Sequence, residues 1–154
     1  MNKKKIIEAA LISLLAVAIV AGSAMLFTDT KSTWYMMLGK PSIQPPAIVF
    51  PIVWSILYLL YAASLTLAII NNASKKTFIL FLILGVLNIA WCLFFFTFKL
   101  PVAALLIILL YLVASYLTIK ELYPFSKWGA LLLIPSMLWI TLATVINYLI
   151  ILLN

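Results

Sequence analysis

The side chains that most often carry enzyme chemistry are scarce in this chain. The sequence has no histidine and no arginine, one cysteine (Cys92) and three acids (Glu8, Asp29 and Glu121). The chain therefore lacks the residues needed for zinc sites rich in protein ligands and for serine–histidine or cysteine–histidine nucleophiles. It also lacks the residues for paired catalytic carboxylates. The composition excludes conventional hydrolytic and metal-dependent chemistry, and we expect no bound metal.

The sequence offers aromatic and amide side chains at helical spacing in three apolar segments. Residues three or four apart lie on one face of a helix. The three stripes are Phe50, Trp54, Tyr58 and Tyr61; Asn88, Trp91 and Phe95; and Trp139, Ala143 and Asn147. Flat aromatic faces with a few amide and phenol groups, and no formal charge, suit a large, planar and mostly apolar ligand.

Two simpler explanations of the stripes remain open. Membrane helices use asparagine for interhelical hydrogen bonds and aromatic rings for bulk, so the stripes could serve packing alone. Tryptophan and tyrosine also gather in a belt at the membrane surface. That belt suits four residues near segment ends: Trp34, Tyr35, Tyr123 and Trp128. Under every explanation Asn88 and Asn147 should point inward, because an unbonded amide in hydrocarbon is costly.

Length and composition place the stripes in a membrane protein. The 154 residues are 68% hydrophobic and 8% charged, whereas soluble domains are about one-quarter charged. A spanning helix needs about 20 mostly apolar residues. We predict one all-α integral membrane domain, residues 1–154, with a long loop between its first two helices. Its five transmembrane helices are expected at about 6–27, 47–70, 77–98, 101–119 and 128–153. Pro51 and Pro135 should loosen two of them beside the stripes.

The lysines predict the orientation. With five spans, seven lysines share the side of the N-terminus: Lys3, Lys4, Lys5, Lys75, Lys76, Lys120 and Lys127. The other side has Lys31, Lys40 and Lys99. The positive-inside rule then predicts a cytoplasmic N-terminus. The lysines form no stripe with interleaved aromatic residues on a helix face, so we expect no nucleic-acid partner.

A secretory signal peptide is the alternative for the first segment. Met1 to Lys5 is a basic start, and Gly22-Ser23-Ala24 resembles a cleavage site. The apolar run continues past these residues to Phe27, which makes it longer than the about 7 to 15 residues of a signal peptide's core. We therefore prefer an uncleaved first span. Without a targeting sequence, and with short loops, a bacterial cell membrane is the expected location.

A pattern in several parts runs through nearly the whole chain. It begins with Trp34-Tyr35, Leu38, Lys40-Pro41-Ser42, Pro45-Pro46, Pro51-Ile52-Val53-Trp54 and Leu57-Tyr58. It continues with Leu87-Asn88, Trp91, Phe95-Phe96, Pro135, Leu138-Trp139, Ala143-Thr144, Asn147-Tyr148 and Leu153-Asn154. In this order the residues resemble the TspO/MBR family, the tryptophan-rich sensory proteins related to the mitochondrial translocator protein, or peripheral benzodiazepine receptor.

The resemblance implies a five-helix membrane protein, usually a homodimer, whose first long loop folds as a lid over a pocket inside the bundle. Family ligands are porphyrins such as protoporphyrin IX and haem, sterols in eukaryotes, and synthetic isoquinoline carboxamide and benzodiazepine compounds. Carried onto this chain, the pocket residues are Trp54, Tyr58, Asn88, Trp91, Phe95, Trp139, Ala143 and Asn147. The lid residues are Trp34, Tyr35, Lys40, Pro41, Pro45 and Pro46.

The leading hypothesis is a membrane receptor or sensor that binds porphyrins and requires no cofactor. An enzyme is the alternative, since some bacterial relatives promote light- and oxygen-dependent breakdown of protoporphyrin IX, and Trp54 and Trp139 match the implicated tryptophans. A transporter of tetrapyrroles or lipids has little support, because no inverted repeat is visible. A purely structural role stays open while packing could explain the stripes. Haem would bind without histidine ligation.

Three departures from the family pattern bear on the pocket. Ile43 stands where tryptophan is common, and Ser136 stands where a tyrosine commonly follows the fifth-helix proline. The sterol-recognition pattern, which is weak even when complete, is incomplete here because no lysine or arginine follows Tyr148, so sterol binding is not assumed. For dimerisation, Ala18 and Gly22 in the first segment and Gly85 in the third permit close helix approach.

Overall fold

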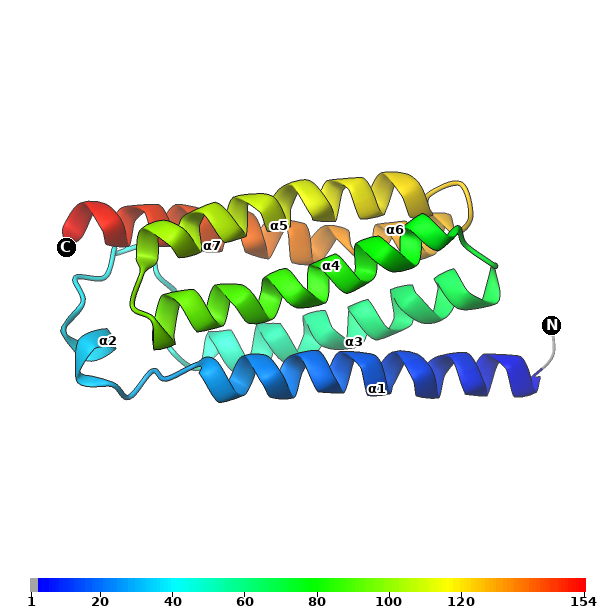
Figure 1. The fold of residues 1–154 in the computed structure, drawn as a ribbon, viewed down its shortest axis with the longest axis horizontal. Coiled ribbons are helices and arrows are strands. Elements are labelled where there is room, and N and C mark those ends of the chain that lie inside the picture. The colour runs from blue at the N-terminus through cyan, green and yellow to red at the C-terminus, as the bar shows by residue number, and fades with distance from the viewer. Residues whose placement is uncertain (1–2) are drawn as a thin grey trace.

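A computed structural model describes residues 3–154 as a bundle of long helices lying side by side (Figure 1). Five helical stretches are long and apolar enough to cross a membrane: Lys3–Phe27, Val49–Ile70, Lys75–Thr97, Pro101–Leu122 and Lys127–Leu153. The described residues contain no strand. The predicted class, an all-α bundle with five spans, is therefore confirmed.

Two of the five stretches are subdivided, and the long first loop contains a short helix. In chain order the elements are α1 (Lys3–Phe27), α2 (Thr33–Met37), α3 (Val49–Ile70), α4 (Lys75–Cys92), η1 (Leu93–Thr97), α5 (Pro101–Leu122), α6 (Lys127–Leu131) and α7 (Ile134–Leu153). Serine side chains accept backbone N–H groups at the starts of α2, α4 and α6, where free N–H groups need partners.

The five spans form a closed ring. α1 packs between α3 and α4, α5 packs between α4 and α7, and α6 returns to contact α3. Toward the α6 side, the interior is filled by buried side chains that include Leu84, Ile108 and Ile140. The Tyr61 and Tyr111 hydroxyls meet there at 2.8 Å and join α3 to α5. The stripes of α3, α4 and α7 continue from this packed region toward the other end.

The two ends of the bundle differ in charge and structure (Figure 1). The start of α1, the α3–α4 turn and the α5–α6 connection share one end. Among the described residues this "basic end" holds Lys3, Lys4, Lys5, Lys75, Lys76, Lys120 and Lys127. The opposite "lid end" holds the α1–α3 loop, the α4–α5 turn and the C-terminus. The lysines thus sort by end as the sequence predicts.

The two prolines flagged in the sequence behave differently. Pro135 lies in the first turn of α7, just after the break that separates α6 from α7, so the fifth span is interrupted beside its stripe. Pro51 is the third residue of an unbroken α3. In the first turn of a helix the backbone N–H has no partner within the helix, so proline costs no hydrogen bond there. The expectation that Pro51 loosens α3 is wrong.

A single π-helical turn, η1, ends the third span. Such wide turns often lie at functional sites. In a regular helix Phe95 and Phe96 would diverge by about 100°, yet here both rings are buried, at 2% and 7% exposure. Both phenylalanine rings of this turn thus lie in the interior at the lid end.

Candidate functional site

The two asparagines of the stripes lie inside the bundle with their amides bonded. Asn88 is 3% exposed and Asn147 is 1% exposed, which confirms that both point inward. The Tyr58 hydroxyl donates to Asn88 Oδ1 at 3.0 Å, and Trp91 Nε1 donates to Asn147 Oδ1 at 3.1 Å. Asn147 Nδ2 in turn donates to the Pro101 carbonyl at 2.9 Å. These bonds tie α3 to α4, α4 to α7, and α7 to the start of α5.

A ring contact completes the circuit between the three helices. Phe50 of α3 meets Trp139 of α7 edge to face, with the ring centroids 5.6 Å apart. α3 is therefore linked to α4, α4 to α7, and α7 back to α3, each time through predicted stripe residues. Ala143, the smallest of the predicted pocket residues, lies one turn from Trp139 and packs against the core.

The aromatic rings at the centre touch one another. Trp91 stacks on Phe95 at a centroid distance of 5.3 Å and an interplanar angle of 21°, and Trp54 lies 5.4 Å from Tyr58. Trp54, Tyr58, Trp91 and Trp139 are each only half-buried, so part of every ring stays accessible. Two hollows of about 460 and 360 Å³ lie elsewhere and are lined by other residues. Because these rings touch, a ligand that stacks between them would have to separate them.

Trp54 and Trp139 each contact a different neighbour, Tyr58 and Phe50 respectively. Both rings are half-buried, and they come from two helices that contact each other through Phe50 and Trp139, α3 and α7. Their involvement in a porphyrin reaction stays a prediction.

The lid packs on this cluster through two rings of α2. Trp34 meets Phe95 edge to face at 5.7 Å, and Tyr35 lies 5.3 Å from Phe96. Burial raises the pKa of the Tyr35 phenol above its usual value, opposed by a hydrogen bond with the Gln44 side chain. Trp34 and Tyr35 thus turn toward the bundle, so ring packing accounts for their position as well as the belt explanation does. The belt explanation fits the exposed Tyr123 and Trp128 at the basic end.

The other predicted lid residues shape its backbone. The Pro41 carbonyl accepts from the Gln44 N–H at 3.0 Å, and the Pro46 carbonyl accepts from the Val49 N–H at 2.9 Å, so both close turns. Pro45 lies half-buried between these turns. The Lys40 ammonium lies 4.4 Å from the centroid of the Tyr35 ring, at a distance suited to a cation–π contact.

A clasp between the lid and the chain end was not predicted. The Gly39 N–H donates to Asn154 Oδ1 at 2.9 Å, and Asn154 Nδ2 donates back to the Gly39 carbonyl at 3.1 Å. A Cβ on Gly39 would lie 3.3 Å from both Cβ and O of Leu153, so glycine allows the close approach. The partners are 115 positions apart. The sequence signal for this end of the chain is the match of Leu153-Asn154 to the family pattern.

The departures from the family pattern fall at the edges of the cluster. Ile43 lies on the lid and is 48% exposed. Ser136 is buried, and its hydroxyl donates to the Leu133 carbonyl at 2.7 Å. That bond caps the break between α6 and α7, where a larger tyrosine would need different packing.

Comparison with known proteins agrees with this architecture. Residues 10–153 match the TspO/MBR family. The chain is 34% identical to the tryptophan-rich protein TspO of Chlorobaculum tepidum, covering 100% of this chain and 99% of that protein. It is 37% identical to the tryptophan-rich protein TspO of Archaeoglobus fulgidus, over 92% and 94%. A tryptophan-rich sensory protein of Cereibacter sphaeroides is 27% identical, over 75% and 73%. The chain is therefore an integral membrane protein of the TspO/MBR family.

Proposed function

We propose that this protein is a membrane sensor that binds a planar tetrapyrrole, such as protoporphyrin IX, between α3, α4, α7 and the lid. One observation carries the proposal. Stripe residues link the three helices in a circuit, through Tyr58–Asn88, Trp91–Asn147 and Phe50–Trp139, and the lid adds a ring above it. The sensory name of the Cereibacter relative agrees with this assignment.

The chemistry of the cluster favours a flat, mostly apolar ligand. Every charged residue described in this chain lies near a helix end or in a connection, so the ligand's ring system would meet only aromatic faces, amides and hydroxyls. Such surroundings stabilise a macrocycle through stacking and dispersion. Lys40 lies above Tyr35 on the lid, where its ammonium could pair with a porphyrin propionate.

The closed arrangement of the rings suggests how binding becomes a signal. Trp34 contacts Phe95, which stacks on Trp91, so a ligand that inserts between these rings must displace the lid. A ligand shifts a conformational equilibrium by its differential affinity for the two states. Binding inside the bundle would thereby favour a lid-open surface that a partner can recognise.

The test is a titration of the purified protein with protoporphyrin IX, followed by the pigment's absorbance. The double variant Trp54→Phe with Trp139→Phe should bind on the order of tenfold more weakly, because each substitution shrinks an indole to a phenyl ring and weakens a contact of about 0.5–1.5 kcal/mol. Trp128→Phe is the control, because Trp128 is 72% exposed at the basic end. Equal affinity of a folded double variant and the control would reject the proposal.

Two further measurements refine the ligand class. Haem should bind about as tightly as the metal-free porphyrin and show no spectrum of histidine ligation, because the chain has no histidine. Isoquinoline carboxamide and benzodiazepine compounds should displace the porphyrin, since their flat rings would use the same faces.

A homodimer is a separate proposal that rests on family membership. Gly85 is already used within the chain, because a Cβ there would lie 2.9 Å from Val20 Cγ2. Gly22 has nothing within 4 Å of a Cβ position, and Ala18 beside it is exposed. This face of α1 is therefore the proposed contact, and Gly22→Leu should lower the mass measured in detergent from dimer to monomer.

A further inference from the structure

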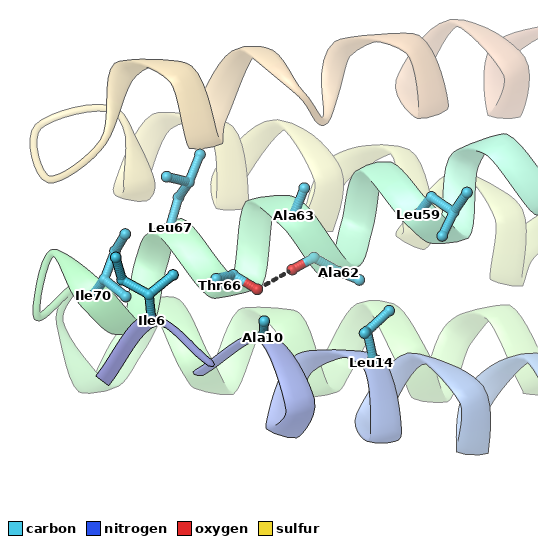
Figure 2. A pocket seen from close by; sticks show the side chains of 9 residues that line it. All are labelled: Ile6, Ala10, Leu14, Leu59, Ala62, Ala63, Thr66, Leu67 and Ile70. Carbon is cyan, nitrogen blue, oxygen red and sulfur yellow. Dashed lines mark hydrogen bonds between the residues drawn. The ribbon is translucent and has the colours of Figure 1, made fainter. Parts of the chain in front are cut away.

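An apolar groove separates α1 from α3 in the half of the bundle nearest the basic end. Figure 2 shows its side chains, with Ile6, Ala10 and Leu14 on α1 facing a row on α3 that runs from Leu59 to Ile70. The hollow measures about 460 Å³. It exists because small side chains, Ala10 on one helix and Ala62 and Ala63 on the other, leave space between the larger ones.

The walls of the groove are almost entirely apolar. Thr66 is the only lining residue with a polar side chain, and its hydroxyl donates to the Ala62 carbonyl at 2.8 Å (Figure 2). A water molecule inside would find only one side-chain partner, the acceptor oxygen of Thr66, whereas a buried water usually makes about three hydrogen bonds. The groove therefore suits a hydrocarbon chain and little else.

A lysine stands at the end of the groove nearest the basic end, next to the lining residues Ile6 and Ile70. Lys5 Nζ lies 3.1 Å from Asn72 Oδ1 and 3.4 Å from the carbonyl oxygen of Ile70, which lines the groove. Both acceptors are neutral, so these contacts position the ammonium without cancelling its charge. An ammonium has three donors, which leaves one for a further acceptor.

The acids of the chain do not compensate Lys5. Glu8 pairs with Lys4 at 3.8 Å, and Glu121 pairs with Lys76 at 2.9 Å. Asp29 follows the far end of α1, in the lid connection. Exposed Lys3 and Lys75 add to the positive potential at the same end. A positioned ammonium group at the end of an apolar groove is complementary to an amphiphile with an anionic headgroup.

We propose that the α1–α3 groove holds an acyl chain of an anionic phospholipid whose phosphate pairs with Lys5. Lysines near a membrane surface attract anionic lipid headgroups, and the groove would fix one such lipid in place. A second copy of this chain is a poorer occupant. Seated in the groove, it would offer Lys5 no unpaired acid, because Glu8 and Glu121 are the acids near this end and each pairs with a lysine.

The experiment measures lipid retained by the full chain. The protein is purified from nanodiscs that contain equal amounts of phosphatidylglycerol and phosphatidylcholine, and native mass spectrometry counts each lipid that remains. Wild type should retain phosphatidylglycerol preferentially. Lys5→Gln should lower that preference about fivefold, whereas Lys5→Arg should keep it. Lys120→Gln, at the same end but on α5, is the matched control.

A second variant tests the groove itself. Ala63→Phe fills the hollow from an exposed position and should reduce retention of both lipids, whereas Val113→Phe, at a 57% exposed position on α5, should not. The proposal is overturned if Lys5→Gln behaves as Lys120→Gln does, if both lipids are retained equally by wild type, or if Ala63→Phe converts a dimer to a monomer without loss of lipid. Porphyrin binding should be unchanged in Lys5→Gln, so this result is independent of the proposed function.

Discussion

Asn147 is the residue whose bonds hold most of the site together. Its amide joins Trp91 of α4 to the Pro101 carbonyl at the start of α5, and it is almost fully buried. A buried acceptor that loses its donor costs about 1–3 kcal/mol. Trp91→Phe removes the indole N–H but keeps a ring against Phe95, so the variant should be less stable by about that amount.

Denaturant unfolding in detergent measures the loss in Trp91→Phe. Trp128→Phe serves as the control, because Trp128 is exposed at the other end, and its stability should match wild type. A Trp91→Phe protein as stable as this control would show that Asn147 finds another donor, and the hydrogen bond would then contribute little to the fold.

Two helical glycines differ in what surrounds them and give a matched pair of substitutions. A Cβ on Gly85 would lie 2.9 Å from Val20 Cγ2, whereas a Cβ on Gly22 would meet nothing within 4 Å. Valine is stiff in a helix, so Gly85→Ala should push α4 from α1 and cost about 1–3 kcal/mol. Gly22→Ala should be neutral or stabilise the protein by up to about 1 kcal/mol. Equal unfolding curves for the two variants would contradict the α1–α4 packing.

At the scale of elements, the lid is held by its rings and by one polar clasp. Asn154→Ala removes both bonds to Gly39 and should favour lid opening by about 1 kcal/mol, or roughly fivefold in the opening equilibrium. Amide hydrogen exchange over residues 28–48 should rise accordingly. Asn71→Ala is the control, because Asn71 bonds only the Leu67 carbonyl of its own helix at the basic end. Unchanged exchange in the lid would mean that its rings alone hold it closed.

Alkaline pH should weaken lid docking through Tyr35. Burial raises the pKa of this phenol in the docked lid. In an undocked lid the phenol would have its ordinary pKa of about 10. The stabilisation is fully present below about pH 10 and is lost as pH rises through the raised pKa. Tyr35→Phe keeps a ring against Phe96 but cannot ionise, so its alkaline loss of thermal stability should be smaller than that of wild type. Identical alkaline curves would exclude a contribution from Tyr35.

The elements were predictable to different degrees, for physical reasons. A membrane-spanning helix can be predicted from the length and hydropathy of its segment. Helical spacing identified the stripes that α3, α4 and α7 turn inward. The π turn depends on tertiary packing, and nothing in the local pattern of Leu93 to Thr97 separates it from a regular helix. The same holds for Phe96, whose place beside the site depends on its contacts with Tyr35 and Trp91. The clasp between Gly39 and Asn154 joins distant segments, so it has no local signal.

At the scale of the whole molecule, the two ends carry different candidate binding sites. The lid end carries the aromatic cluster, the lid and the clasp, while the basic end carries seven lysines and the mouth of the lipid groove. The buried Tyr61–Tyr111 pair lies in the packed core between them. A tetrapyrrole and a phospholipid would therefore occupy separate sites in the same bundle.

The distribution of lysines also predicts how the molecule sits in the membrane. The basic end should face the cytoplasm by the positive-inside rule, which places the lid outside. Cys92 is the chain's one cysteine and is buried, so a Cys92→Ala background allows single-site labelling. A membrane-impermeant maleimide added to intact cells should label Lys40→Cys on the lid. It should reach Lys120→Cys only after the cells are made permeable, and the reverse pattern would place the aromatic site and its lid on the cytoplasmic side.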